Sequence, residues 1–228
     1  MEVKLIKYTT DPVQLTDECA SVCYDSESNG DGKVSEHCYS SGHLSVLEHA
    51  SFTFKVSGVS RACTHQLVRH RTGKYTQRSQ RYCKEDNFSY VVPTSIQNNK
   101  EAFEAYTDAM EAVASLYDKL INYGVATEDA RYILPNACCS TIYVTFDGRN
   151  LLHFMNERLC SCAQWEIRSV AEAMKRCLKE ADGCEFFFKH CVPKCEAGKV
   201  KYCNEPENRS CHRHPTASTI NKLITKEE

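Results

Sequence analysis

The chain has 228 residues, which is enough for one sizeable domain or two small ones. Its composition, 42% hydrophobic and 25% charged, is that of a globular protein and excludes a disordered chain. Lysine and arginine total 28 against 30 aspartate and glutamate, so a broad attraction to nucleic acid or to an anionic membrane is not expected.

The N-terminal half is predicted to alternate strands with helices. Residues 3–8 alternate apolar and basic side chains, which is typical of a strand. An Asp-Pro pair opens the next segment and predicts a helix over 11–23, with the aspartate as its cap and the proline in its first turn. After a polar, glycine-containing loop, the alternation at 51–57 predicts a half-buried strand, and 61–69 is predicted to be helical.

The C-terminal half is predicted to contain the longest helix. In residues 101–123 apolar side chains recur at steps of three and four, and a glycine ends the pattern. The next elements are a short helix over 127–134 capped by Thr127, a strand over 140–146, and helices over 149–159 and 163–180. Together the elements predict one α+β domain over 1–185, with a central, mostly antiparallel sheet and flanking helices, followed by a cysteine-rich tail over 186–228.

The chain contains fifteen cysteines, but it is long for a disulfide framework and has no segment typical of a signal peptide. Most thiols before Cys184 are expected to act as small buried hydrophobic side chains. The tail offers soft zinc ligands at His190, Cys191, Cys195, Cys203, Cys211, His212 and His214. Because its spacing contains no Cys-x-x-Cys pair, free thiols or one disulfide are favoured and no metal is predicted. No apolar run reaches transmembrane length, so the cytoplasm is the expected location.

A local excess of positive charge lies between Glu48 and Glu85, a stretch without any aspartate or glutamate. Its densest part is Arg69–Tyr82. Guanidinium groups match phosphate oxygens in pairs, and hydroxyls and amides complete such sites. A solvated basic face is one interpretation, and a nucleic-acid surface is another, although such surfaces are usually wider and the protein basic overall. The alternation of arginine with Gln77 and Ser79 favours a small phosphorylated ligand in a pocket.

Several separated blocks of the sequence agree with one known pattern. The first consists of Arg69-His70-Arg71, seven further residues and Ser79. The others are His43-x-Ser45-x-x-Glu48-His49, Ala130-Arg131-x-x-Leu134-Pro135, and Arg149-x-Leu151 followed by Phe154, Arg158 and Ala163–Arg168. In these blocks, and in their order over roughly residues 2–180, the chain resembles the flavin-dependent thymidylate synthase family.

The resemblance implies the reductive methylation of dUMP to dTMP. In this family 5,10-methylenetetrahydrofolate donates the methylene group and FAD reduced by NADPH donates the hydride, without an enzyme nucleophile. The resemblance also implies a homotetramer whose active sites are assembled between subunits, with Arg131 contributed by a neighbouring subunit. Neither nucleic acid nor a membrane is expected as a partner.

The same resemblance assigns the site residues. Arg158 is implied to be catalytic, placed against the pyrimidine edge, where it stabilises negative charge at N3 and O2. The implied dUMP site comprises Gln66, Arg69, Gln77, Arg78, Ser79, Gln80, Arg81, Arg131 and Arg158. The implied FAD site comprises Ser45, Arg69, His70, Arg71, Gln77, Asp147, Arg149 and His153.

Four positions depart from the family's usual pattern. Lys74, Thr76 and Gln77 stand where members often carry Ser, Asn and Glu, and Asp147 stands where Asn is usual. Gln77 removes a negative charge beside the nucleotide and the flavin. Asp147 adds one near the flavin, which disfavours an anionic reduced cofactor unless the carboxylate is hydrogen-bonded.

The sequence leaves alternatives open. Ser79 has no carboxylate nearby in sequence to orient a histidine base, so a phosphate ligand is favoured over a nucleophile. His43 and His49 are interpreted as core residues or metal ligands, with metal the less favoured. A non-catalytic nucleotide- or RNA-binding module would retain the arginine cluster. A cysteine-dependent uracil methylase needs a nucleophilic cysteine, which the matched blocks do not provide at a family-typical position.

Overall fold

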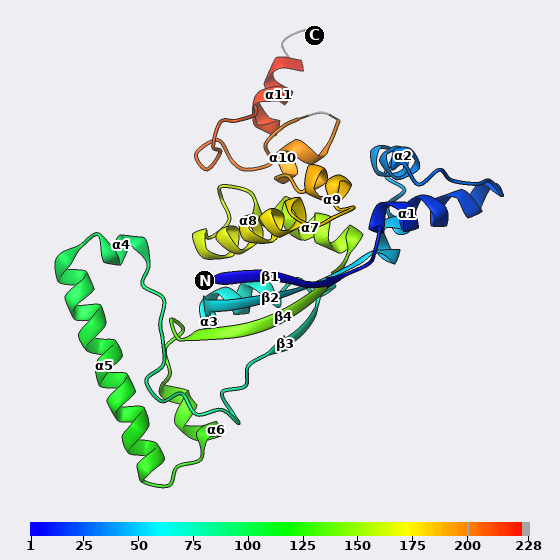
Figure 1. Ribbon diagram of the computed structural model, residues 1–228. Helices are drawn as coiled ribbons and strands as arrows, with labels where there is room; N and C mark the ends of the chain where they lie inside the picture. The colour runs from blue at the N-terminus through cyan, green and yellow to red at the C-terminus, as the bar shows by residue number, and fades with distance from the viewer. Residues whose placement is uncertain (200, 225–228) are drawn as a thin grey trace. The chain divides into compact units, whose positions relative to one another are not determined.

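The computed structural model describes residues 1–199 and 201–224 and has the predicted α+β class. Its four-stranded antiparallel sheet has the order β1-β2-β4-β3 (Figure 1). The strands are β1 (Glu2–Tyr8), β2 (Ser51–Ser60), β3 (Lys74–Gln77) and β4 (Cys139–Asp147). The strands predicted at 3–8, 51–57 and 140–146 are therefore confirmed, and the short β3 within the basic segment was not predicted.

Alternation along the two middle strands explains why they were predictable. On β2 the side chains of Phe52, Phe54 and Val56 are buried, and those between them are partly exposed. On β4 every second side chain from Ser140 to Phe146 is buried. A strand with one buried face must alternate in this way, because successive side chains point to opposite sides of the sheet.

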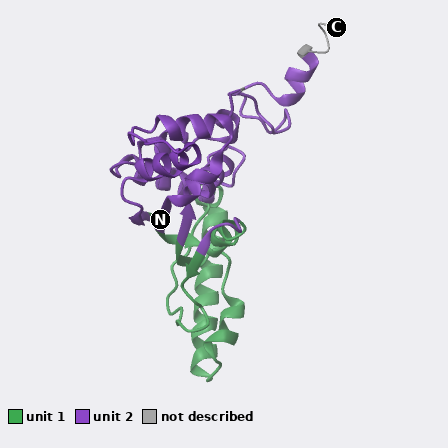
Figure 2. Ribbon diagram, turned by 90° about the vertical axis from the view of Figure 1, so that its right-hand side faces the viewer, with its two compact units in different colours: residues 1–2, 55–69, 75–143 green, residues 3–54, 70–74, 144–228 purple. Residues whose placement is uncertain are grey.

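The chain divides into two compact units, which Figure 2 shows in different colours. Unit 1 comprises residues 1–2, 55–69 and 75–143. Unit 2 comprises residues 3–54, 70–74 and 144–228.

Unit 1 contains the long helix that the sequence predicts. Its helices are α3 (Arg61–Leu67), α4 (Thr94–Gln97), α5 (Lys100–Asn122), α6 (Thr127–Ala130) and the 3-10 helix η3 (Arg131–Ile133). The Asn99 side chain caps α5 by accepting a hydrogen bond from the Ala102 amide at 3.1 Å. Gly124 follows its end at a φ of +84°, a conformation that glycine adopts without a Cβ penalty.

The apolar stripe of α5 is only partly covered within unit 1. Tyr117 is fully buried, and its hydroxyl accepts a hydrogen bond from the Glu85 amide at 3.3 Å. Phe103 and Leu116 remain 40% and 46% exposed. The stripe therefore offers apolar surface for further packing.

Unit 2 is built around a cluster of aromatic side chains. Its helices are α1 (Pro12–Ser21), η1 (Val22–Tyr24), α2 (Lys33–Ser41), η2 (Leu44–His49), α7 (Gly148–Arg158), α8 (Trp165–Lys179), α9 (Glu185–His190), α10 (Lys194–Ala197) and α11 (Ala217–Ile224). Phe52 packs against Phe187 at 4.7 Å between ring centroids, and Phe146 stacks on Phe154 at 5.2 Å. Gly148 starts α7 where a Cβ would lie 2.6 Å from the Leu47 carbonyl oxygen, so a larger residue does not fit there.

One predicted cap is wrong, and another is confirmed in position only. Asp11 is the N-cap residue of α1 and Pro12 lies in the first turn, as predicted, but Asp11 has a left-handed φ of +45° and its side chain makes no capping hydrogen bond. Ala126, rather than Thr127, is the N-cap of α6, because the Thr127 hydroxyl donates to the Arg81 carbonyl oxygen instead. The helix predicted over 127–134 is also divided into α6 and η3.

Helix α2 was not predicted, because its stability depends on distant residues. The segment is polar and shows no apolar stripe. The fully buried Asp17 carboxylate accepts hydrogen bonds from the Gly32 amide at 2.8 Å and from the Ser35 amide at 2.7 Å. These bonds satisfy amides at the beginning of α2, which the helix itself leaves unpaired. None of the described helices is both long and apolar enough to cross a membrane.

Candidate active site

In unit 1 the part of the basic segment that follows β3 forms ion pairs with acidic residues of the same chain. The Arg78 amide donates to the Thr141 carbonyl oxygen of β4 at 2.9 Å. Its guanidinium forms an ion pair with Glu85 and donates to the Lys84 carbonyl oxygen at 3.0 Å. Glu85 is 7% exposed and the Arg78 side chain is 38% exposed, so only the carboxylate of this pair is withdrawn from water. The hydrogen bond to Glu85 raises the pKa of Arg78.

Two further arginines meet at Glu128 on α6. The Arg81 guanidinium pairs with the Glu128 carboxylate, and the Arg131 Nε donates to the Glu128 carbonyl oxygen at 3.0 Å. Arg81 remains 53% exposed. Arg81 and Arg131 of one chain thus both bind Glu128. Each arginine keeps guanidinium nitrogens that these two bonds do not use.

The serine of the segment shapes a turn. The Ser79 hydroxyl accepts a hydrogen bond from the Arg81 amide at 3.2 Å, and the Ser79 carbonyl oxygen accepts one from the Cys83 amide at 3.0 Å. Gln80, the next residue, is buried with its amide nitrogen 3.5 Å from the Cys138 sulfur. This turn holds the Ser79 hydroxyl beside the backbone of Arg81.

The hydrogen bonds of the Gln77 side chain explain why an amide stands at this position. Its Nε2 donates to the hydroxyls of Thr64 and Ser140, both at 3.0 Å. The Thr64 hydroxyl uses its own proton on the Arg61 carbonyl oxygen, so it must accept from Gln77. An ionised glutamate has no proton to donate, and the replacement of the family's usual glutamate by glutamine therefore suits this bridge.

Gln66 and Arg69 lie at the end of α3. The Arg69 amide donates to the Gln66 carbonyl oxygen at 3.3 Å. Gln66 is half-buried and Arg69 is exposed. These two side chains therefore extend the exposed polar part of unit 1.

In unit 2, His70 is enclosed by rings. Its centroid lies 5.0 Å from that of His153, 5.2 Å from that of Phe154 and 6.1 Å from that of Phe146. Burial, followed by the charges of His153 and Arg158, lowers the pKa of His70 to about 4. The imidazole is therefore neutral at pH 7.

Helix α7 carries the next group of predicted residues. Asp147 caps it by accepting from the Asn150 amide at 2.9 Å and from the Asn150 side chain at 2.7 Å. Both carboxylate oxygens of Asp147 are thus hydrogen-bonded. Arg149 forms an ion pair with Glu48 at 2.6 Å. Glu48 and the exposed Ser45 both belong to η2, which packs against α7.

Arg158 is the last residue of α7. Its Nε is buried and has no hydrogen-bond partner among the described residues. Its sequence neighbour Glu157 interacts with Lys194 at 3.3 Å. A buried N–H that is left unpaired is costly, so this guanidinium is poised for a further acceptor.

Comparison with known proteins now adds to this geometry. A model of the family described as "Thymidylate synthase complementing protein" matches residues 4–182. A flavin-dependent thymidylate synthase of Geobacter sulfurreducens is 42% identical over 193 residues, which cover 78% of this chain and 82% of the relative. This chain belongs to the flavin-dependent thymidylate synthase family.

Other members agree over more of the chain. The flavin-dependent thymidylate synthase of Nitratidesulfovibrio vulgaris is 38% identical, and the alignment covers 96% of this chain and 97% of the relative. A crystal structure of the Helicobacter pylori enzyme, described as complexed with FAD and dUMP, has a TM-score of 0.68 at 23% identity. The alignment covers 84% of this chain and 100% of the Helicobacter pylori chain. At 23% identity, it shows a similarity of fold alone. The resemblance predicted from the sequence is confirmed.

The family's motifs identify the basic residues of this thymidylate synthase chain but not their acidic partners. Glu85 and Glu128 bind Arg78 and Arg81 in unit 1, and Glu48 binds Arg149 in unit 2. The sequence pointed to one of these acidic partners, because Glu48 stands in the same motif block as Ser45. The other two pairings join residues whose partnership no local pattern indicates.

The His70 environment predicts a pH-dependent stability for this family member. Because its folded-state pKa is about 4, against an ordinary 6.5, the unfolded chain takes up the proton first as the pH falls. This contribution to stability is complete above about pH 6.5 and is lost progressively towards pH 4. Urea unfolding at a series of pH values should show a steeper loss in the wild type than in His70→Asn.

The exposed His37 provides the matched control. The His37→Asn variant should keep the wild-type slope, because it leaves the ring cluster around His70 intact. Equal slopes for the wild type and His70→Asn would show that the His70 imidazole titrates alike in the folded and unfolded chains.

Proposed function

We propose that this chain converts dUMP to dTMP, taking the methylene group from 5,10-methylenetetrahydrofolate and the hydride from FAD that NADPH reduces. The observation that carries the proposal is the family match over residues 4–182, which includes every predicted site residue. FAD, when bound, supplies the hydride and so replaces the enzyme thiolate of other uracil methylases.

In this proposal most of the residues that bind the nucleotide belong to unit 1. Arg81 and Arg69 are exposed, and the Ser79 hydroxyl lies between arginines in sequence, as suits a phosphate. Arg78 is engaged by the buried Glu85, so its main contribution is to hold the turn that presents Ser79. Gln66, Gln77, Gln80 and Arg131 complete the proposed dUMP site, with Arg158.

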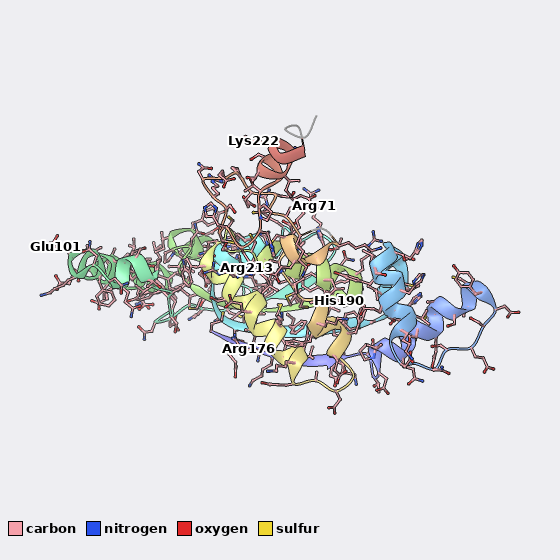
Figure 3. All side chains as sticks on the ribbon, turned by 90° about the horizontal axis from the view of Figure 1, so that it is seen from above. Arg71, Glu101, Arg176, His190, Arg213 and Lys222 are labelled. Carbon is pink, nitrogen blue, oxygen red and sulfur yellow. The ribbon has the colours of Figure 1, made fainter. Side chains whose placement is uncertain are left out.

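The FAD site of the proposal draws on the exposed cations and hydrogen-bonding groups of unit 2. Arg71, Arg149 and His153 are exposed, and Figure 3 labels Arg71. Guanidinium groups of this kind fit the diphosphate of a dinucleotide. The remaining members are Ser45, His70 and Asp147, with Arg69 and Gln77. Neutral His70 offers one N–H donor and one acceptor rather than a charge.

Arg158 has the catalytic role in the proposal. Arg158 would face N3 and O2 of the pyrimidine, where a guanidinium would stabilise negative charge on the ring. A guanidinium presents parallel N–H donors to such an edge, and a donor that is already in place need not reorganise during the reaction. The buried, unpaired Nε supports this assignment, since a ligand acceptor would satisfy it.

Cys138 does not fit the role of a cysteine nucleophile at the proposed nucleotide site. Cys138 lies beside Gln80, with its sulfur 3.5 Å from the amide nitrogen. Burial, with the nearby charge of Glu85, raises the pKa of Cys138 to about 11. The thiolate is the nucleophilic form, so this side chain is almost entirely inert at neutral pH.

We further propose that the chain works as a homotetramer with sites assembled between subunits. The half-exposed apolar stripe of α5 supports this assembly, because such a surface is normally covered by another protein surface. Arg131 then serves a neighbouring subunit through the guanidinium nitrogens that Glu128 leaves free. Glu128 positions it for this purpose.

The purified protein is expected to be yellow, to contain FAD, and to oxidise NADPH faster when dUMP is present. Anaerobic reduction with NADPH, with and without dUMP, followed by addition of methylenetetrahydrofolate, measures each step in turn. A nucleotide- or RNA-binding module without turnover would neither purify with flavin nor take it up on reconstitution. That outcome would overturn the proposed function.

A further inference from the structure

Five cysteine thiols of unit 2 line one cavity of about 210 Å³ at the end of α7. Two of them, Cys160 and Cys162, lie in the loop between α7 and α8, and the others are Cys195 on α10, Cys203 and Cys211. All five are free of disulfide bonds. The sequence analysis grouped only Cys195, Cys203 and Cys211, all of which belong to the tail. Cys160 and Cys162 lie in the family block from Arg149 to Arg168, so the cavity brings the tail and this block together.

The tail reaches this cavity through several polar contacts. Helix α10 packs against α7, and Lys194 interacts with Glu157 at 3.3 Å. The Cys162 thiol lies 2.9 Å from the Arg209 carbonyl oxygen. Arg213, which Figure 3 labels, pairs with Glu196 at 2.7 Å. The Cys203 amide donates to the Pro215 carbonyl oxygen at 2.8 Å, so the segment closes into a loop.

The tail has almost no hydrophobic core to hold this loop. Between residues 192 and 222, among those that the structure describes, the buried side chains are Cys203 and Thr216. Exposed ion pairs contribute little to stability, typically below about 1 kcal/mol each. A segment of this kind usually needs a disulfide or a metal to stay ordered.

The thiols are arranged around the cavity rather than in one pair. Cys160, Cys162 and Glu205 have ligand atoms within 4.8 Å of one another. Sulfur ligands of a tetrahedral zinc ion, with Zn–S bonds of about 2.3 Å, lie about 3.8 Å apart. Cys195 and Cys203 line the same cavity as these two thiols.

We propose that Cys160, Cys162, Cys195 and Cys203 bind one structural zinc ion, which fastens the tail to the end of α7. Zinc binding displaces the four thiol protons, and the divalent cation stabilises the four thiolates. Four thiolate ligands form a closed tetrahedral site of the structural kind. Cys160 is two residues beyond Arg158, so the ion also anchors the helix end that carries this arginine.

Three other groups at the cavity have partners of their own. The Cys211 sulfur accepts hydrogen bonds from the Arg213 amide and the Ser161 hydroxyl, which, in that order, lower the pKa of Cys211. Cys195, Glu196 and His214 also have ligand atoms within 4.8 Å of one another. Glu196, however, is engaged by Arg213 at 2.7 Å and faces the His214 Nε2 at 3.9 Å. Cys211, Glu196 and His214 therefore support the tail rather than the ion, whereas Glu205, which belongs to the group with Cys160 and Cys162, is the alternative fourth ligand.

The full-length protein, purified in reductant without chelator from zinc-supplemented culture, should contain about one zinc ion per chain by elemental mass spectrometry. Cys160→Ser and Cys203→Ser should lower this content about tenfold or more. Cys211→Ser, in the same cavity, and the exposed Cys23→Ser, which does not line it, should keep the wild-type content. Cobalt substituted for zinc should give the intense thiolate charge-transfer absorption of about four sulfur ligands.

A second measurement separates loss of the site from misfolding. Removal of zinc from the wild type should make four additional thiols reactive to a thiol reagent and increase hydrogen exchange in residues 201–222. The FAD content should stay unchanged, which makes the result independent of the proposed reaction. Absence of zinc from the wild type, iron in its place, a disulfide within the set, or full zinc retention in Cys203→Ser would overturn the proposal. Loss of zinc in Cys211→Ser would overturn the ligand set.

Discussion

Replacing Arg158 by alanine is expected to lower the rate of dTMP formation about a hundredfold, because one preorganised donor to a developing negative charge is worth ~3 kcal/mol. Arg158→Lys should fail as well, since a point ammonium does not reproduce the planar fork. Single-turnover kinetics with reduced enzyme, dUMP and methylenetetrahydrofolate measure the effect on chemistry, and equilibrium dUMP binding measures the effect on affinity.

Ser79→Ala is the informative comparison. The change removes a hydroxyl that accepts from the Arg81 amide and that we assign to the phosphate, so dUMP affinity should fall while some turnover remains. A nucleophile at this position predicts the reverse, with turnover abolished and binding retained. If Ser79→Ala shows that reversed pattern and Arg158→Ala stays near the wild type, the two assigned roles are wrong.

Mixing two inactive variants should restore activity if the sites are assembled between subunits. Arg131→Ala and Arg158→Ala would each be reduced to about one per cent of wild-type activity. In a one-to-one mixture of exchanging subunits, about a quarter of the sites receive both wild-type residues, because each has an even chance. Activity after partial unfolding and refolding of the mixture, with hybrid formation verified by mass spectrometry, measures the recovery.

The matched control pairs two variants of the same helix. Arg149 and Arg158 both belong to α7, so each site receives both from one chain and no combination of Arg149→Ala with Arg158→Ala is complete. That mixture should stay at the level of its parents. Equal behaviour of the two mixtures would argue for sites contained within one subunit.

Much of the secondary structure was predictable because burial on one face produces a local period. The alternation at Phe52, Phe54 and Val56 and the stripe along α5 both arise in this way. By contrast, β3 has only four residues, and its half-buried positions are Tyr75 and Gln77. A polar residue that is buried for a hydrogen bond breaks the very pattern on which such predictions rest.

For the candidate site, too, the sequence predicted one part and the structure supplied another. The motif around Arg69 and Ser79 identified the family, and membership is confirmed by the match over residues 4–182. The individual roles and the domain boundary predicted at residue 185 stay predictions. The structure adds partners for these side chains, such as the Thr64 and Ser140 hydroxyls that explain Gln77.

The sequence by itself determined the fold class, the family and the residue types that carry the chemistry, because these depend on periodicity and on short motifs read along the chain. Only the tertiary structure decided which acid holds each arginine, why His70 is neutral, and how Cys160 comes to share a cavity with Cys203. The reason is physical. Pairing, desolvation and ligand geometry depend on groups that are close in space yet far apart in sequence, and no local pattern encodes them.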